Sequence, residues 1–173
     1  TETRPHGCHC EEYWTTSPKA CSGCHSPTTR QLHKDAVLPE TEAAGRIRYV
    51  ELPWVAAGTD ERGVPYVGQA SAFVSHSWDT PWNYLVETLC GWAADHERRH
   101  PDGAPLYFWV DIFAINQHGG GAQAADMYSF REPNEGVGFP AVIRAAKRSI
   151  VVMEPWLRPR PATRVWCLFE MNK

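Results

Sequence analysis

Four cysteines near the start of the chain have a spacing that suits a metal ion. One residue separates Cys8 from Cys10, and two residues separate Cys21 from Cys24. Two close pairs of thiolates match tetrahedral zinc, and residues 1–25 contain too few aliphatic side chains to fold without such support. We expect structural zinc here, because four protein ligands leave no open position for catalysis. Disulfides and a disordered remnant are the alternatives.

Three short apolar runs predict buried strands. They are Ser71–Ser75, Leu106–Ile115, which only Asp111 interrupts, and Ser149–Met153. Strands that are apolar on both faces and alternate with helices are typical of a parallel sheet covered by helices. We therefore expect an α/β fold with a flavodoxin-like parallel sheet and helices on both faces.

Helix signals separate these strands. Thr80 is expected to cap a helix that has Pro81 at its first position, where the missing N–H costs nothing. A second helix is predicted over Phe139–Arg148, and Thr163 is expected to cap a last helix that carries Glu170. Ligands of parallel α/β sheets bind beyond the carboxyl ends of the strands. Polar and aromatic residues gather at those ends, so the binding site is expected there.

The region before the first strand has a different pattern. Residues 26–45 are polar and broken by proline, which indicates a linker. Residues 46–69 are expected to form an extension, in which Ile47–Trp54 alternates like an edge strand. A turn over residues 59–63 would then return the chain as a hairpin partner over Val64–Val67.

Composition and charge exclude some classes of partner. The net charge of −3 provides no general field for nucleic acid or an anionic membrane. No apolar run approaches the roughly 20 residues that span a bilayer, and no signal peptide is visible. We therefore expect a cytoplasmic protein with reduced cysteines. The first residue is Thr, so the chain is expected to be a piece of a longer one.

Three segments resemble the TIR (Toll/interleukin-receptor/resistance) domain. Phe73–Thr80 is similar to the first strand and loop of plant-type TIR domains, Ser149–Val152 to the third strand, and Arg164–Glu170 to the segment with Trp-Cys-Leu-x-Glu. The chain is more closely similar to TIR-like proteins of algae and other eukaryotic microbes. The resemblance covers residues 70–173, with two departures. A loop with three consecutive glycines follows the second strand, and the last strands of a complete TIR domain are missing.

The resemblance implies cleavage of the bond between nicotinamide and ribose in NAD⁺, with Glu170 as the catalytic carboxylate. Nicotinamide carries a positive charge on its ring nitrogen and leaves neutral, so only the cationic sugar needs stabilisation. A half-buried glutamate beside the ribose can supply it. A solvated glutamate that pairs with Arg164 or Lys173 is the alternative.

Further residues are expected to bind the substrate, from the last helix and from the loops at the strand ends. Each has a structural alternative, such as core packing for the indoles or turn formation for the amide. They are Trp166, Ser75, His76, Trp78, Asp79 and Asn116.

The favoured function is an NAD⁺ glycohydrolase, with or without cyclase activity, that acts in immune or stress signalling. Such a domain is expected to self-associate, because neighbouring subunits of enzymatic TIR domains complete the site. The alternative is a non-catalytic, self-associating signalling module with a structural zinc segment.

Overall fold

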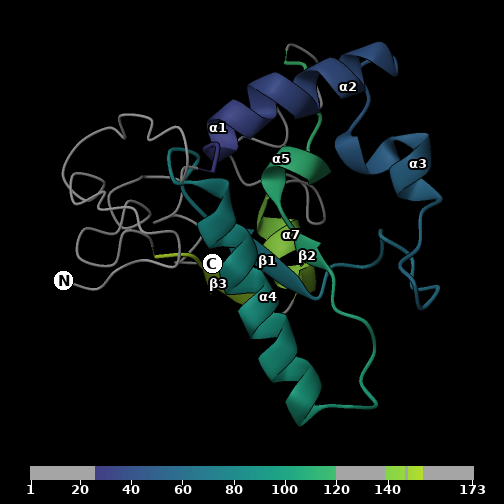
Figure 1. Ribbon diagram of the computed structural model, residues 1–173, viewed down its shortest axis with the longest axis vertical. Helices are drawn as coiled ribbons and strands as arrows, with labels where there is room; N and C mark the ends of the chain where they lie inside the picture. Colours follow the sequence, from purple (N-terminus) through teal and green to yellow (C-terminus); the bar gives the residue numbers. More distant parts are fainter. Residues whose placement is uncertain (1–25, 120–138, 147, 154–173) are drawn as a thin grey trace.

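A parallel three-stranded sheet forms the centre of the computed structural model, which describes residues 26–119, 139–146 and 148–153 (Figure 1). The strands are β1 (Ala72–Ser75), β2 (Phe108–Trp109) and β3 (Ser149–Val151), and their order is β2-β1-β3. Ala72 is aligned with Phe108, and Phe73 with Ser149. The predicted parallel α/β sheet is thus confirmed.

Two helices cover opposite faces of this sheet. Helix α4 (Trp82–Arg99) connects β1 to β2, and helix α7 (Phe139–Ala146) precedes β3. Connections between parallel strands are almost always right-handed. Since β2 and β3 lie on opposite sides of β1, right-handed connections place their helices on opposite faces. In Figure 1, α4 lies in front of β1 and α7 behind it.

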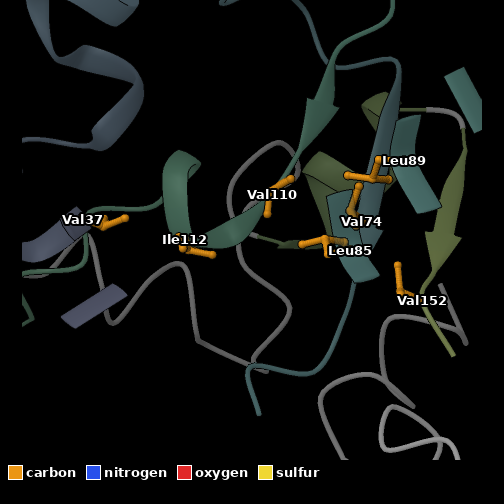
Figure 2. Close-up of a cluster of buried hydrophobic side chains, with 7 residues drawn as sticks. All are labelled: Val37, Val74, Leu85, Leu89, Val110, Ile112 and Val152. Atoms are coloured by element: carbon orange, nitrogen blue, oxygen red, sulfur yellow. The ribbon is translucent and has the colours of Figure 1, made fainter. Parts of the chain in front are cut away.

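The alternating side chains of β1 divide the core in two. Val74, which is 2% exposed, packs with Leu85 and Leu89 of α4 (Figure 2). We call the buried cluster on this face the α4-side core. Phe73 points to the other face, where it packs with Ile143 of α7 and its ring stacks on Trp109. Successive residues of a strand point to opposite faces, so each half of the core draws on alternate residues of β1.

Helix α4 begins differently from the sequence prediction. Its N-cap is Pro81, whose own side chain makes no capping hydrogen bond. Pro27 O accepts a hydrogen bond from Trp82 N at 2.8 Å, and Ser26 Oγ accepts one from Asn83 N at 3.1 Å. The prediction of a Thr80 cap is therefore wrong, because a distant part of the chain satisfies the first N–H groups of the helix.

The segment expected to be a linker is helical. It contains α1 (Thr29–Leu32), the π-helical turn η2 (His33–Val37) and α2 (Leu38–Ala43). Thr28 starts it with a capping box in which its side chain and that of Gln31 bond each other's backbone N–H. Val37, the last residue of η2, is 1% exposed in the α4-side core, and this burial accounts for the ordered helix.

The predicted edge strand over Ile47–Trp54 is wrong. The chain there forms the 3₁₀ helix η3 (Tyr49–Glu51) and the helix α3 (Pro53–Ala56). Pro53 occupies the first turn of α3, where a proline favours a helix. The hairpin partner predicted over Val64–Val67 is wrong too, because Thr59 and Pro65 form only an isolated bridge.

The second predicted strand is shorter than expected. β2 ends at Trp109, and helix α5 (Asp111–Ala114) follows. Asp111 Oδ1 accepts a hydrogen bond from Ile112 N at 2.7 Å. A carboxylate in the first turn of a helix is stabilised by the helix dipole, so Asp111 ends the strand and starts a helix.

The predictions for α7 and for the third strand are confirmed, with slightly shorter bounds. In the described part of the chain, no helix combines the length and the apolar character needed to cross a membrane.

Candidate functional site

The carboxyl ends of β1 and β3 meet at the point where the strand order reverses. The chain passes from β1 to β2 on one side and then to β3 on the other. Ser75, the last residue of β1, is aligned with Val151, and its carbonyl accepts a hydrogen bond from Val152 N at 2.9 Å. In open parallel sheets, the crevice at such a reversal is the usual place for a ligand.

Two buried hydroxyl groups at this end of β1 have no hydrogen-bond partner among the described residues. Ser75 is 2% exposed and Thr80 is 7% exposed, and neither Ser75 Oγ nor Thr80 Oγ1 has a partner among the described residues. Leaving a buried polar group unsatisfied costs about 1–3 kcal/mol. Ser75, a predicted site residue, therefore has a hydroxyl that a ligand could satisfy.

Trp78, also a predicted site residue, is fixed by a carboxylate from the start of α5. Its indole Nε1–H donates to Asp111 Oδ2 at 2.8 Å. The other oxygen of Asp111 lies 3.9 Å from Nε2 of His76, whose side chain is buried. A hydrogen bond to a charged acceptor is stronger than one between neutral groups, so Asp111 holds the indole in one orientation.

His33 joins this group, although the sequence analysis did not select it. Its ring lies 4.9 Å from the indole of Trp78, between centroids. Burial lowers the pKa of His33, and the negative charge of Asp111 opposes part of that change. His33 Nε2 has no hydrogen-bond partner within the described ranges. No local signal could have identified this residue, because it lies in the segment expected to be a linker.

Asp79 lies at the outer side of the group. Its Oδ1 is 2.8 Å from Nε of Arg30, and both side chains are about half exposed. The hydrogen bond from this pair raises the pKa of Arg30. The Arg30 guanidinium also lies over the Trp78 ring, 5.9 Å from its centroid. Arg30 therefore neutralises the Asp79 carboxylate, which was predicted to face the substrate, and its guanidinium lies next to the indole of Trp78.

Asn116 has contacts that stabilise a loop. Its Nδ2 donates to Arg46 O at 2.7 Å, and its Oδ1 accepts from His118 N at 3.0 Å. His118 Nε2 lies 2.7 Å from Thr41 Oγ1. These bonds attach the loop after α5 to α2 and the residues that follow it. A substrate contact by Asn116 would compete with them.

The remaining predicted residues lie outside the described ranges. They are Glu170 and Trp166 of the last predicted helix, and the cysteines Cys8, Cys10, Cys21 and Cys24. Within the described ranges, no three His, Cys, Asp or Glu side chains are grouped so that they could hold a metal ion.

The described candidate residues therefore form two groups. Ser75, with a buried hydroxyl that has no partner among the described residues, lies at the reversal of strand order. The second group consists of an indole fixed by a carboxylate, two histidines and an exposed ion pair, from the loop after β1, the start of α5 and the α1–η2 segment. Comparison with known proteins adds no family: no family model, curated protein or solved structure matches this chain.

Proposed function

We propose that this chain is an NAD⁺ glycohydrolase whose substrate binds at the carboxyl ends of β1 and β3. The single observation that carries the proposal is the reversal of strand order beside Ser75, whose buried hydroxyl has no partner among the described residues. Dinucleotides bind across such reversals in other parallel sheets. The resemblance of Phe73–Thr80 and Arg164–Glu170 to TIR segments supports the choice of NAD⁺.

The chemistry requires one carboxylate. The bond between the ribose and the nicotinamide nitrogen breaks, and its electron pair neutralises the positive ring. Water then adds to the sugar cation and releases a proton, so the products are nicotinamide, ADP-ribose and H⁺. We assign the stabilisation of the sugar cation to Glu170. Ser75 would bind a ribose hydroxyl or a phosphate, and the indoles of Trp78 and Trp166 would offer flat surfaces to the rings.

The test is the release of nicotinamide from NAD⁺, measured by chromatography with the protein at high concentration, so that assembled forms are present. Glu170→Gln is expected to reduce release at least about 100-fold, as is typical when a group that stabilises transition-state charge is removed. Glu87→Gln, a change of an exposed glutamate on α4, is the matched control and is expected to retain full activity.

Two results would contradict the proposal. If Glu170→Gln and Glu87→Gln both retain full release, Glu170 has no catalytic role. If the unchanged protein releases no nicotinamide at any concentration, the non-catalytic, self-associating module becomes the better hypothesis. Ser75→Ala separates binding from chemistry, because it is expected to raise KM more than it lowers kcat.

The zinc proposal has its own test. Elemental analysis of the purified protein is expected to find one zinc ion per chain, held by Cys8, Cys10, Cys21 and Cys24. Replacing Cys21 and Cys24 together by Ser should remove it, whereas Cys90→Ser, a change in α4, should not. Protein without zinc in which these four cysteines are oxidised would contradict the assignment.

A further inference from the structure

A large apolar groove lies beside β2, on the side away from β1. Its volume is about 580 Å³, which lies within the range of known ligand sites. Residues 106–110 form its floor, and α4 forms one wall. The rest of the lining comes from η3, α3, the chain after them and α5. Eight of its twenty lining residues are aromatic. None of the predicted site residues within the described ranges lines it.

The exposed apolar side chains of the protein gather in this groove. Four large hydrophobic residues are exposed within the described ranges, namely Trp54 (58%), Tyr66 (54%), Val86 (38%) and Val67 (37%). All four line the groove. Scattered exposed hydrophobic residues are ordinary, but a group of them in one depression marks a binding surface.

The floor of the groove offers an unused strand edge. Tyr107 O accepts hydrogen bonds from Ala72 N of β1 and from Ser71 N just before it, so this carbonyl points toward β1. Backbone groups of successive residues in a strand point in opposite directions, and the N–H and C=O of Phe108 therefore point away from β1. No hydrogen bond from the described residues reaches them. Such a donor and acceptor pair is what an added strand would use.

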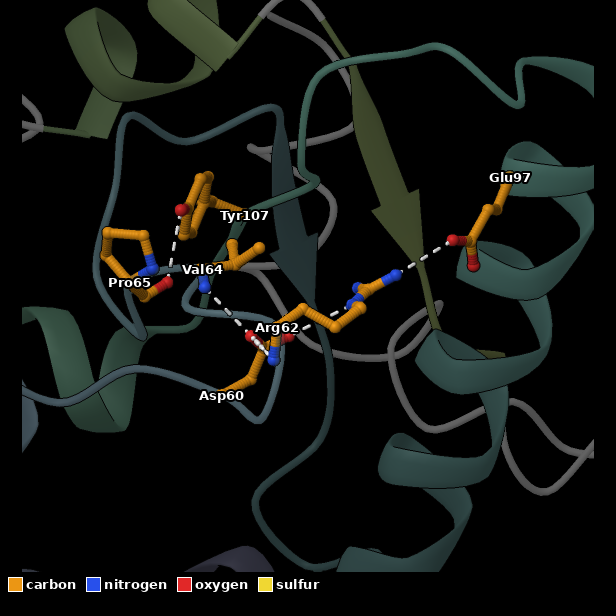
Figure 3. A network of polar contacts seen from close by, with 6 residues as sticks. All are labelled: Asp60, Arg62, Val64, Pro65, Glu97 and Tyr107. Carbon is orange, nitrogen blue, oxygen red and sulfur yellow. Dashed lines mark hydrogen bonds and ion pairs between the residues drawn. The ribbon is translucent and has the colours of Figure 1, made fainter.

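The charges around the groove favour an uncharged occupant. Arg48 is the one charged residue in the lining, and its Nη2 lies 2.6 Å from Glu51 Oε1. Outside the lining, Arg62 is paired with Asp60 and with Glu97 (Figure 3). Because Arg48 is paired with Glu51, the lining of the groove presents an apolar, aromatic surface with no unpaired charge to attract an ion.

The rim is held in place before any partner binds. The Tyr107 hydroxyl donates to Pro65 O at 3.1 Å, and Asp60 Oδ1 accepts from Val64 N at 2.8 Å (Figure 3). The first contact joins the chain after α3 to Tyr107, just before β2, and the second closes the turn within that chain. The groove is therefore a channel with fixed walls at the outer edge of the strand. A narrow extended peptide fits such a channel better than the sheet edge of a second folded copy, which the walls would obstruct.

We propose that this groove binds an uncharged, apolar peptide segment of another protein, which adds as a strand to the outer edge of β2. Phe108 supplies the backbone hydrogen bonds, and the groups around Trp54, Tyr66 and Val86 bind alternate side chains of the peptide. The site is separate from the NAD⁺ site proposed at the carboxyl ends of β1 and β3.

The probe is a fluorescein-labelled heptapeptide with blocked ends that alternates threonine with valine and phenylalanine. Its binding to the full chain is followed by fluorescence anisotropy. Two isomers carry N-methyl groups on one or the other set of alternate amides. Only one set faces β2 in an added strand, so one isomer is expected to lose about tenfold or more in affinity while the other retains it.

Two matched variants test whether the peptide binds in the groove. Val86→Lys places a charge in the apolar wall and is expected to weaken binding about tenfold or more, because the ammonium would lose water when the peptide covers it. Glu87→Lys, the neighbouring change on α4 outside the groove, is expected to bind as the unchanged protein does. Both residues are exposed, and equal melting temperatures confirm that both variants fold.

Several results would overturn the proposal. They are the absence of saturable binding up to millimolar peptide, equal behaviour of the two isomers, and undiminished binding to Val86→Lys. A flat aromatic dye that binds the groove when the peptide does not would show that it takes a small molecule instead. A dimer of the unchanged protein that Val86→Lys dissociates would show that a second copy occupies it.

Discussion

The hydrogen bond between Trp78 and Asp111 links the loop after β1 to the start of α5, and its removal is expected to cost measurable stability. Asp111→Ala removes the acceptor of the 2.8 Å bond from the indole and also the oxygen that accepts from Ile112 N. A hydrogen bond to a charged group contributes about 1.5–3 kcal/mol. The Asp111 side chain is 25% exposed, so water replaces part of the lost bond. We therefore expect a loss of about 2 kcal/mol in the free energy of unfolding.

A double-mutant cycle isolates this bond from other effects. Trp78→Phe removes the donor but keeps a ring, and the double variant removes both partners. The coupling energy, measured by urea denaturation, is expected to be about 1–2 kcal/mol. Asp95→Ala serves as the control, because its carboxylate forms only exposed ion pairs on α4 and should cost less than about 1 kcal/mol.

Additive effects of the two single changes would refute the reasoning. They would mean that each side chain contributes through its own surroundings and that the carboxylate does not orient the indole. A loss for Asp111→Ala no larger than that for Asp95→Ala would have the same meaning. Either result would also weaken the proposed role of Trp78 as a fixed surface for the substrate.

Other changes test further parts of the structure. Burial lowers the pKa of His33, so the unfolded chain takes up a proton at a higher pH than the folded protein does. The free energy of unfolding should therefore fall as the pH drops through about 6.5. Urea melts at pH 7.5 and 5.5 should show a smaller fall for His33→Gln than for the control His100→Gln, which changes an exposed residue. Gly63 has φ of 77°, so Gly63→Ala should lower the free energy of unfolding by about 1 kcal/mol in urea melts. Gly91 is exposed on α4, so Gly91→Ala should raise the free energy of unfolding by about 0.5–1 kcal/mol. Arg62→Ala removes exposed ion pairs and should change stability by less than about 1 kcal/mol in the same melts.

The elements that could be predicted from sequence are those whose signals are local. The apolar run that forms β1, the helical spacing in α4 and the pattern of α7 and β3 predicted buried strands and amphipathic helices. The alternation of strands and helices also predicted the parallel sheet, because a strand that is apolar on both faces needs helices on both sides. The residues at the end of β1 could be selected as a site for the same reason, since the carboxyl end of a buried parallel strand is where ligands bind.

Only the tertiary structure decided the features that depend on distant contacts. Residues 29–43 are polar enough to suggest a linker, yet burial of Val37 in the α4-side core makes them helical. Thr80 has the right type for a cap, but Pro27 and Ser26 satisfy the first N–H groups of α4. Asp111 accepts a hydrogen bond from an indole 33 residues away. Local patterns record what a segment prefers alone, whereas these outcomes depend on which partner the fold brings within hydrogen-bond or packing distance.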